Sequence, residues 1–170
     1  MRERRILPGN TTGLATQVGW PDWGIAVAER VKDSIDIKGT SEDIFEVAAD
    51  YASYPEWQDQ VKKVEVLETD KDGYGTVVHY EVDAVLKKLS YTLDYDYSGW
   101  PKYFTWKLRD GDLKSLDGRY SFDEFDDVTE VTYEIAIEPG FKIPSVLRRQ
   151  GEKQIVSTAL KGLKKRVESR

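Results

Sequence analysis

The last third of the chain constrains the fold more than any other part of the sequence. Several strands with alternating aromatic residues run into residues 139–144, and one long amphipathic helix follows them. Successive side chains of a strand point to opposite faces of a sheet, whereas side chains of a helix share a face about every three to four residues. This order predicts a curved antiparallel sheet closed by a single C-terminal helix, with a hollow between the two. Such a hollow is expected to hold a hydrophobic small molecule.

Strands are expected wherever apolar and polar residues alternate between turn signals. The turn signals are rich in Gly, Pro and Asp, as at residues 99–101, 110–112 and 123–127. The expected strands are residues 33–38, 61–68, 76–86, 89–98, 102–110, 113–123 and 128–138. One face of these strands is aromatic and aliphatic, whereas the other, from His79 to Glu134, carries mainly charged and hydroxyl side chains. This contrast is typical of an antiparallel sheet with one buried and one solvated face.

Three helices are expected. Thr40 or Ser41 is suited to cap a short helix with acidic residues in its first turn. A second short helix, broken by Pro55, is expected at residues 51–57. The long helix covers residues 144–168, with a proline at its first position. Its expected apolar stripe consists of Leu147, Gln154, Ile155, Thr158, Ala159, Gly162, Leu163 and Val167.

The inward face of the expected sheet is unusually rich in tyrosine. Buried phenols need hydrogen-bond partners, so many of them in one tight core would be awkward. In a ligand cavity, by contrast, the rings form apolar walls and a few hydroxyls orient the polar end of a ligand. The alternative is ordinary packing, with hydroxyls reaching water at the strand ends. The expected ligand-binding residues are Tyr80, Tyr91, Tyr95, Tyr97, Trp106, Tyr120 and Tyr133 of the sheet, with Ile155 and Ala159 of the helix.

The same inward face lacks the groups that proton-transfer catalysis uses. It contains no carboxylate, histidine or lysine, so no catalytic residue is assigned. His79 is expected on the solvated face, unless a β-bulge turns it and Asp83 inward. The chain has no cysteine and one histidine, which excludes disulfides and the usual zinc sites. Residues 70–73 lack the later ligands of a calcium loop, and no cofactor is expected.

Charge is unevenly distributed along the chain. The net charge is −6, yet residues 142–170 hold nine Lys and Arg against two acids. The acidic remainder argues against nucleic-acid binding, which needs a basic face. The basic residues of the helix either are merely solvated or favour peripheral contact with an anionic membrane. They are Arg148, Arg149, Lys153, Lys161, Lys164, Lys165 and Arg166.

The N-terminal region differs from the rest of the chain. Residues 1–30 carry scattered Gly, Thr and Pro without periodicity, and we expect a poorly ordered or loosely docked extension. Alternatively, Trp20, Trp23 and Ile25 pin this segment onto the body or a partner. Residues 31–170 are expected to form one domain.

No stretch approaches the roughly 20 apolar residues of a membrane span, so we expect a cytoplasmic protein. The oligomeric state is left open.

Several short motifs resemble a known superfamily. They are DYASYPEW at 50–57, VKKV at 61–64, FTW at 104–106, GRYSF at 118–122, TEVTY at 129–133, and Pro139-Gly140 with Ile143-Pro144. With the order of elements, they resemble the helix-grip fold of the START/Bet v 1-like (SRPBCC) superfamily over residues 31–168. Most similar are bacterial proteins of the polyketide cyclase/dehydrase or coenzyme Q-binding type. The resemblance implies an α+β fold, in which a curved seven-stranded antiparallel sheet and two short helices wrap around a long C-terminal helix.

Three functions are open, and the resemblance implies the first two. The first is binding or transport of a hydrophobic small molecule such as a lipid, quinone or polyketide between the sheet and the C-terminal helix. The second is an enzyme, a polyketide aromatase/cyclase that acts in the same cavity. A third interpretation is a protein-interaction module that uses the outer face of the sheet and the N-terminal tryptophans.

Overall fold

The computed structural model of the chain describes residues 30–84 and 87–170. These residues form one seven-stranded antiparallel sheet in the order β1-β7-β6-β5-β4-β3-β2. The strands are β1 (Val31–Lys38), β2 (Val61–Thr69), β3 (Gly75–Asp83), β4 (Lys88–Asp96), β5 (Tyr103–Gly111), β6 (Ser115–Phe125) and β7 (Val128–Glu138). The predicted α+β helix-grip architecture is confirmed.

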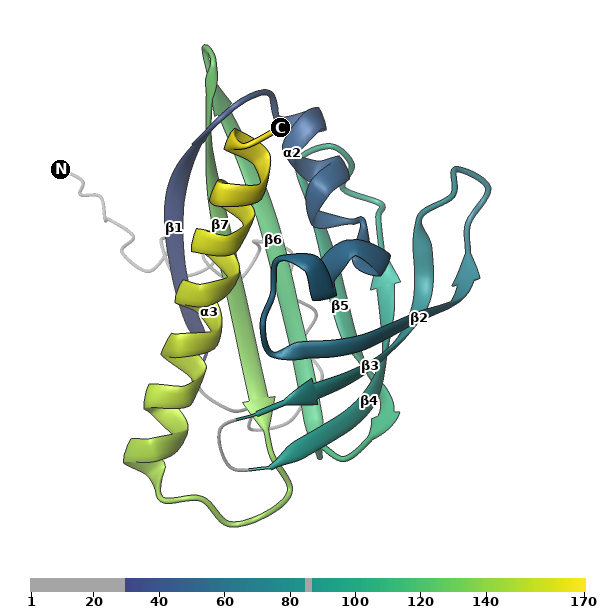
Figure 1. Ribbon diagram of the computed structural model, residues 1–170, viewed down its shortest axis with the longest axis vertical. Coiled ribbons are helices and arrows are strands. Elements are labelled where there is room, and N and C mark those ends of the chain that lie inside the picture. Colours follow the sequence, from purple (N-terminus) through teal and green to yellow (C-terminus); the bar gives the residue numbers. More distant parts are fainter. Residues whose placement is uncertain (1–29, 85–86) are drawn as a thin grey trace, which may run out of the picture.

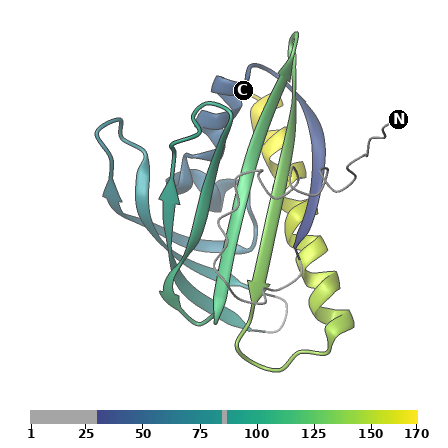
Figure 2. The same cartoon turned by 180° about the vertical axis from the view of Figure 1, so that it is seen from behind.

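The sheet curves around the helices, and all described helices lie on its concave side (Figure 1). The long helix α3 (Ser145–Glu168) crosses in front of β1 and β7, whereas two short helices cover the other half of the sheet. Figure 2 shows the opposite, convex side, where the strands lie in front of the helices. This curvature places the inward side chains of β3 to β7 around a common interior.

The two short helices lie where their sequences predict them. In α2 (Ser41–Ala48), the Thr40 side chain accepts a hydrogen bond from Asp43 N at 3.1 Å and thereby caps the first turn. The next helix, η1 (Tyr51–Glu56), is a 3₁₀ helix that contains Pro55. A 3₁₀ helix suits this position because proline lacks the N–H that a longer α-helix would need.

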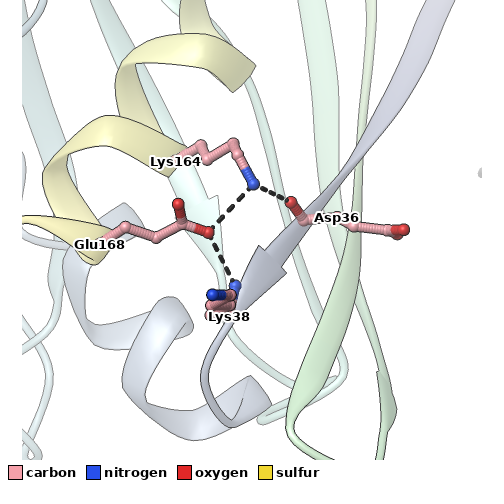
Figure 3. A network of polar contacts seen from close by, with 4 residues as sticks. All are labelled: Asp36, Lys38, Lys164 and Glu168. Atoms are coloured by element: carbon pink, nitrogen blue, oxygen red, sulfur yellow. Dashed lines mark hydrogen bonds and ion pairs between the residues drawn. The ribbon is translucent and has the colours of Figure 1, made fainter.

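The C-terminal turns of α3 are fastened to the edge strand β1 (Figure 3). Lys164 Nζ donates to the backbone carbonyl of Asp36 at 2.6 Å and to Glu168 Oε2 at 3.0 Å. Glu168 Oε2 also accepts the backbone N–H of Lys38 at 3.0 Å. The Lys38 N–H, and then Lys164, lower the pKa of Glu168 below its ordinary value. Lys164 therefore holds the helix in place and is not merely solvated.

The predicted apolar stripe of α3 is wrong in its phase. The buried residues are Glu152, Val156, Ala159, Leu160 and Leu163, so only Ala159 and Leu163 were predicted correctly as buried. Leu147 and Ile155 are exposed, Ile155 by 40%. The prediction left out Val156 and Leu160 as well as Glu152, although all three belong to the buried face of the helix, which contacts β1 and β7. The helix also starts one residue later than predicted, because Pro144 caps it.

The convex face of the sheet is not solvated throughout, contrary to the prediction. Thr92, Asp117 and Arg119 lie on this face and are buried. Asp117 forms an ion pair with Arg30 at 2.7 Å, and burial raises the pKa of Asp117 against the opposing effect of Arg30. The Arg119 guanidinium lies 4.0 Å from the Tyr103 ring centroid, and its Nε donates to Ser121 Oγ. These partners compensate the buried charges of Asp117 and Arg119. The alternation of apolar and polar residues in a strand does not predict such partners.

Candidate functional site

Cross-strand pairing brings the sequence-predicted residues together in the interior. Tyr80 lies opposite Tyr91, Tyr95 opposite Trp106, and Tyr120 opposite Tyr133. Opposite residues of antiparallel strands have Cβ atoms about 4.5–5.5 Å apart, so each pair forms one contact across the sheet. Tyr97 lies just beyond the end of β4, and its ring is nearly parallel to that of Tyr95, with centroids 6.3 Å apart. The seven predicted sheet residues thus share one concave surface.

The two predicted residues of α3 lie in different environments. Ala159 is buried and belongs to the face that packs on the sheet. Ile155 lies on the exposed side of the helix, for the reason given above. The structure therefore brings Ala159 to the interior but does not bring Ile155 there.

Five interior tyrosines bond to other protein groups, and we call them the paired tyrosines. The hydroxyls of Tyr80 and Tyr95 are 2.6 Å apart, and those of Tyr51 and Tyr97 are 2.8 Å apart. Tyr97 also donates to the Gly75 carbonyl, and Tyr54 donates to the Ala48 carbonyl. These bonds satisfy the hydroxyls of the two η1 tyrosines and of the three sheet tyrosines that they face.

Three further tyrosines, Tyr91, Tyr120 and Tyr133, differ from the paired tyrosines, and we call them the unpaired tyrosines. Their hydroxyls make no hydrogen bond within residues 30–84 and 87–170, although Tyr120 is only 2% exposed. Trp57 Nε1 is also without a partner there, and it is sealed from solvent. The three phenol oxygens are not sealed in this way. Each keeps contact with space that a water-sized probe reaches.

Burial dominates the electrostatics of the unpaired tyrosines. Burial, and then the neighbouring phenols of Tyr120 and Tyr91, raise the pKa of Tyr133 well above its ordinary value. Burial raises the pKa of Tyr91 to about 12. Burial, and then Tyr120 and other phenols, likewise raise the pKa of Tyr54. All these phenols therefore stay protonated at neutral pH and act as uncharged donors and acceptors.

Trp106 lies between Tyr95 of the paired set and Tyr120 and Tyr133 of the unpaired set. Its ring centroid is 5.9 Å from that of Tyr95, and 5.7 and 5.4 Å from those of Tyr120 and Tyr133. The indole lies directly on Gly118, where an added Cβ would be 2.2 Å from Trp106 Cζ2. The glycine opposite Trp106 is therefore required for this close approach of ring and backbone.

Three interior residues were not predicted as site residues. Tyr51 and Tyr54 lie on η1, in the very motif that carried the resemblance, and they supply two of the paired hydroxyls. Glu152 is a carboxylate that is only 5% exposed, on the inner face of α3. The spacing of Glu152, Val156, Ala159 and Leu163 is helical, and this signal would have found the carboxylate if charge had not excluded it.

Two surface pockets lie near the paired tyrosines. The larger one, of about 700 Å³, lies between the β2–β3 turn and the β4–β5 turn; its lining includes Tyr95 and Tyr97. We call it the mouth pocket. The other, of about 420 Å³, lies between α2, the same β2–β3 turn and the end of α3. The remaining predicted site residues line neither of these pockets.

The described residues offer few catalytic or metal-binding groups. His79 lies on the convex face, where its Nδ1 is 2.9 Å from Thr92 Oγ1 and its Nε2 is 3.1 Å from Ser90 Oγ. The β2–β3 pair contains register shifts, but they do not turn His79 inward, and His79 lies opposite Thr92. The predicted position of His79 on the outer face of the sheet is therefore confirmed. Among the described residues, no group of three or more His, Cys, Asp or Glu is arranged to hold a metal ion. None of the described helices has the length and apolarity to cross a membrane.

The sheet, the closing helix and the tyrosine-lined interior define a START-like helix-grip protein. The family model for "polyketide cyclase / dehydrase and lipid transport" matches residues 37–164, and the chain belongs to this family. No curated protein matches the chain significantly.

Several solved structures share the fold. A START superfamily protein of Mycobacterium smegmatis is 19% identical, with a TM-score of 0.75 over 82% of this chain and 97% of its own. The Zhui aromatase/cyclase of Streptomyces sp. R1128 is 16% identical, with a TM-score of 0.73 over 84% and 94%. A STAR-related lipid transfer protein of Xanthomonas axonopodis is 18% identical, with a TM-score of 0.63 over 82% and 85%. At these identities the similarity establishes the fold.

Proposed function

We propose that the chain binds a hydrophobic small molecule, such as a lipid, quinone or polyketide, in a hollow between the sheet and α3. One observation carries this proposal: three phenols of the interior, those of the buried Tyr120 and of the partly buried Tyr91 and Tyr133, lack hydrogen bonds to the described residues yet remain unsealed. A buried hydroxyl without a partner costs about 1–3 kcal/mol, so a fold rarely gathers such groups in its interior. A ligand whose polar atoms complete these bonds accounts for the arrangement.

The chemistry of the interior narrows the ligand class. The neutral phenols donate hydrogen bonds but carry no charge that would neutralise an anion or a cation. The surrounding rings of Trp106, Phe104 and Phe122 favour a flat or aliphatic body. We therefore favour an uncharged ligand with carbonyl-type acceptors over a fatty acid or a phospholipid, both of which carry a charge.

Tryptophan fluorescence tests this proposal with two matched probes. Menadione carries two carbonyls on a naphthalene ring system, and 2-methylnaphthalene lacks them. We expect menadione to bind, and Tyr120→Phe or Tyr133→Phe to weaken it about 5- to 10-fold, since a neutral hydrogen bond contributes about 1 kcal/mol. Tyr51→Phe, which removes a paired hydroxyl, is the control and should leave the affinity unchanged. If neither probe binds, or if all three variants bind equally, the proposal is wrong.

A second candidate function is an enzyme, an aromatase/cyclase acting in the same hollow. Glu152 favours it, because proton transfer needs an ionisable group and this carboxylate is buried on the inner face of α3. Its proposed role is to accept and return protons while a poly-β-ketone folds. Turnover of such a substrate should be lost in Glu152→Gln while menadione binding persists. Full turnover by this variant would remove Glu152 from the reaction.

A further inference from the structure

The mouth pocket combines aromatic rings with acidic side chains and contains no basic one. Its aromatic lining is Tyr74, Tyr95, Tyr97 and Trp100, and its acidic lining is Asp70, Asp72 and Asp96. Thr76 and Ser98 complete the lining. The basic neighbours in the chain, Lys71 and Lys102, are not part of it. A pocket of about 700 Å³ falls within the usual size of small-molecule sites, about 300–1,000 Å³.

The three carboxylates have no ion pair among the described residues. One oxygen of Asp70 accepts the backbone N–H groups of Asp72 and Tyr74 at 2.9 and 3.0 Å, which fixes the turn. One oxygen of Asp96 accepts the N–H of Ser98 at 2.8 Å. Their other oxygens, and the carboxylate of Asp72, make no hydrogen bond within the described part of the chain. A concave site with three like charges concentrates a negative potential.

The rings of this pocket form a continuous wall. The ring centroids of Tyr74 and Tyr97 are 5.0 Å apart with a tilt of 31°, and the ring of Tyr95 lies nearly parallel to that of Tyr97. Trp100 stands at the rim and is 47% exposed, held by an edge contact with Phe45. Aromatic faces attract cations, and the attraction is stronger where water is excluded.

These observations select one class of ligand. A metal ion requires several oxygen ligands at about 2–2.6 Å from one point, and the described acids form no such group. An organic ammonium group is larger, tolerates carboxylates at a distance and gains from ring faces. We propose that the mouth pocket binds an alkylammonium group of a small molecule. This site is separate from the unpaired tyrosines, so it stands or falls independently of the function proposed above.

Choline and 3,3-dimethylbutan-1-ol test the proposal, because they have nearly the same shape and differ in charge. The readout is the indole N–H signal of Trp100 in ¹H–¹⁵N spectra, assigned with Trp100→Leu. At low salt we expect choline to shift this signal and to bind at least 10-fold more tightly than the alcohol. Added salt should weaken choline binding, since these charges are exposed to solvent.

Charge variants complete the test. We expect Asp72→Asn and Asp96→Asn each to weaken choline binding about 3- to 10-fold. Asp59→Asn removes an exposed acid outside the pocket and should leave the binding unchanged. The proposal is overturned if choline does not shift the Trp100 signal, if the alcohol binds equally well, or if all three variants bind choline alike. Because none of these side chains is buried, the variants are expected to fold.

Discussion

The paired and the unpaired tyrosines occupy the same concave face, yet they differ in one respect. Tyr51 and Tyr120 are both 2% exposed, and both lie in the aromatic core. The Tyr51 hydroxyl is bonded to Tyr97, whereas the Tyr120 hydroxyl has no protein partner among the described residues. Burial alone therefore does not separate a structural phenol from one that is available to a ligand. The presence or absence of a hydrogen-bond partner does separate them, because protein folds leave few buried polar groups without partners.

The largest expected effect is on the whole fold at alkaline pH. Burial raises the pKa of Tyr91 from 10.0 to about 12, and raises that of the paired Tyr80 and Tyr95 as well. A raised folded-state pKa means that the stabilisation is fully present below the unfolded value and is lost as pH rises through the folded value. We expect the free energy of unfolding to fall above pH 10, with cooperative unfolding near pH 12.

Phenolate absorbance at 295 nm, recorded together with circular dichroism, measures this effect. The same experiment tests whether the unpaired tyrosines are enclosed like the paired ones. We expect the buried phenols to ionise in the same step in which secondary structure is lost. If the unpaired tyrosines were open to bulk water, part of the phenolate signal would instead appear before unfolding. Such an early step, removed by Tyr91→Phe and Tyr133→Phe, would contradict the enclosed hollow that we propose.

A smaller effect is expected where Trp106 lies between the paired Tyr95 and the unpaired Tyr120 and Tyr133. Gly118→Ala places a Cβ 2.2 Å from Trp106 Cζ2, so the indole must move toward one of the two sets. Overpacking of this kind costs about 1–3 kcal/mol. Urea unfolding of Gly118→Ala should show this loss and a changed tryptophan emission.

Gly151→Ala is the matched control for this variant. An added Cβ at Gly151 meets nothing within 4 Å, and alanine is favoured in a helix by roughly 0.5–1 kcal/mol. We expect Gly151→Ala to be stabilised or unchanged. Equal stability of Gly118→Ala and the parent chain would show that Trp106 is free to move, and that its contact with Gly118 does not fix its place between Tyr95 and Tyr120.

Much of the fold follows from local sequence patterns. The period of two in the strands correctly placed Tyr80, Trp106 and Tyr120 inside and His79 outside, because a one-residue shift would turn every side chain over. Turn chemistry located β7 at Val128–Glu138 and the other strands to within about three residues. The Thr40 cap was predicted for the same reason, since capping depends on neighbouring residues alone.

Other features depend on contacts that no local pattern contains. Glu152 faces inward although it is charged, because the packing of α3 on β1 and β7 sets the rotation of the helix. The burial of Asp117 depends on Arg30, which is 87 residues away in the chain. The pairing of the Tyr97 hydroxyl depends on Tyr51 of η1, which lies 46 residues away in the chain and becomes its neighbour only on folding. The predictions for residues 1–29, including Trp20 and Trp23, lie outside the described residues.

The smallest effect tests the comparison most directly. Tyr51→Phe and Tyr120→Phe remove the same hydroxyl from two equally buried rings, so the loss of apolar packing is nearly the same in both. Tyr51→Phe leaves the Tyr97 hydroxyl without one of its two bonds, and should lower the free energy of unfolding by about 1 kcal/mol. Tyr120→Phe breaks no bond to the described residues, and we expect a change within about 0.5 kcal/mol in the ligand-free protein.

Urea unfolding of both variants, with and without menadione, separates the structural role of Tyr51 from the ligand-binding role of Tyr120. An equal loss of stability in the ligand-free variants would mean that Tyr120 also bonds within the protein, and the unpaired tyrosines would no longer mark a ligand site.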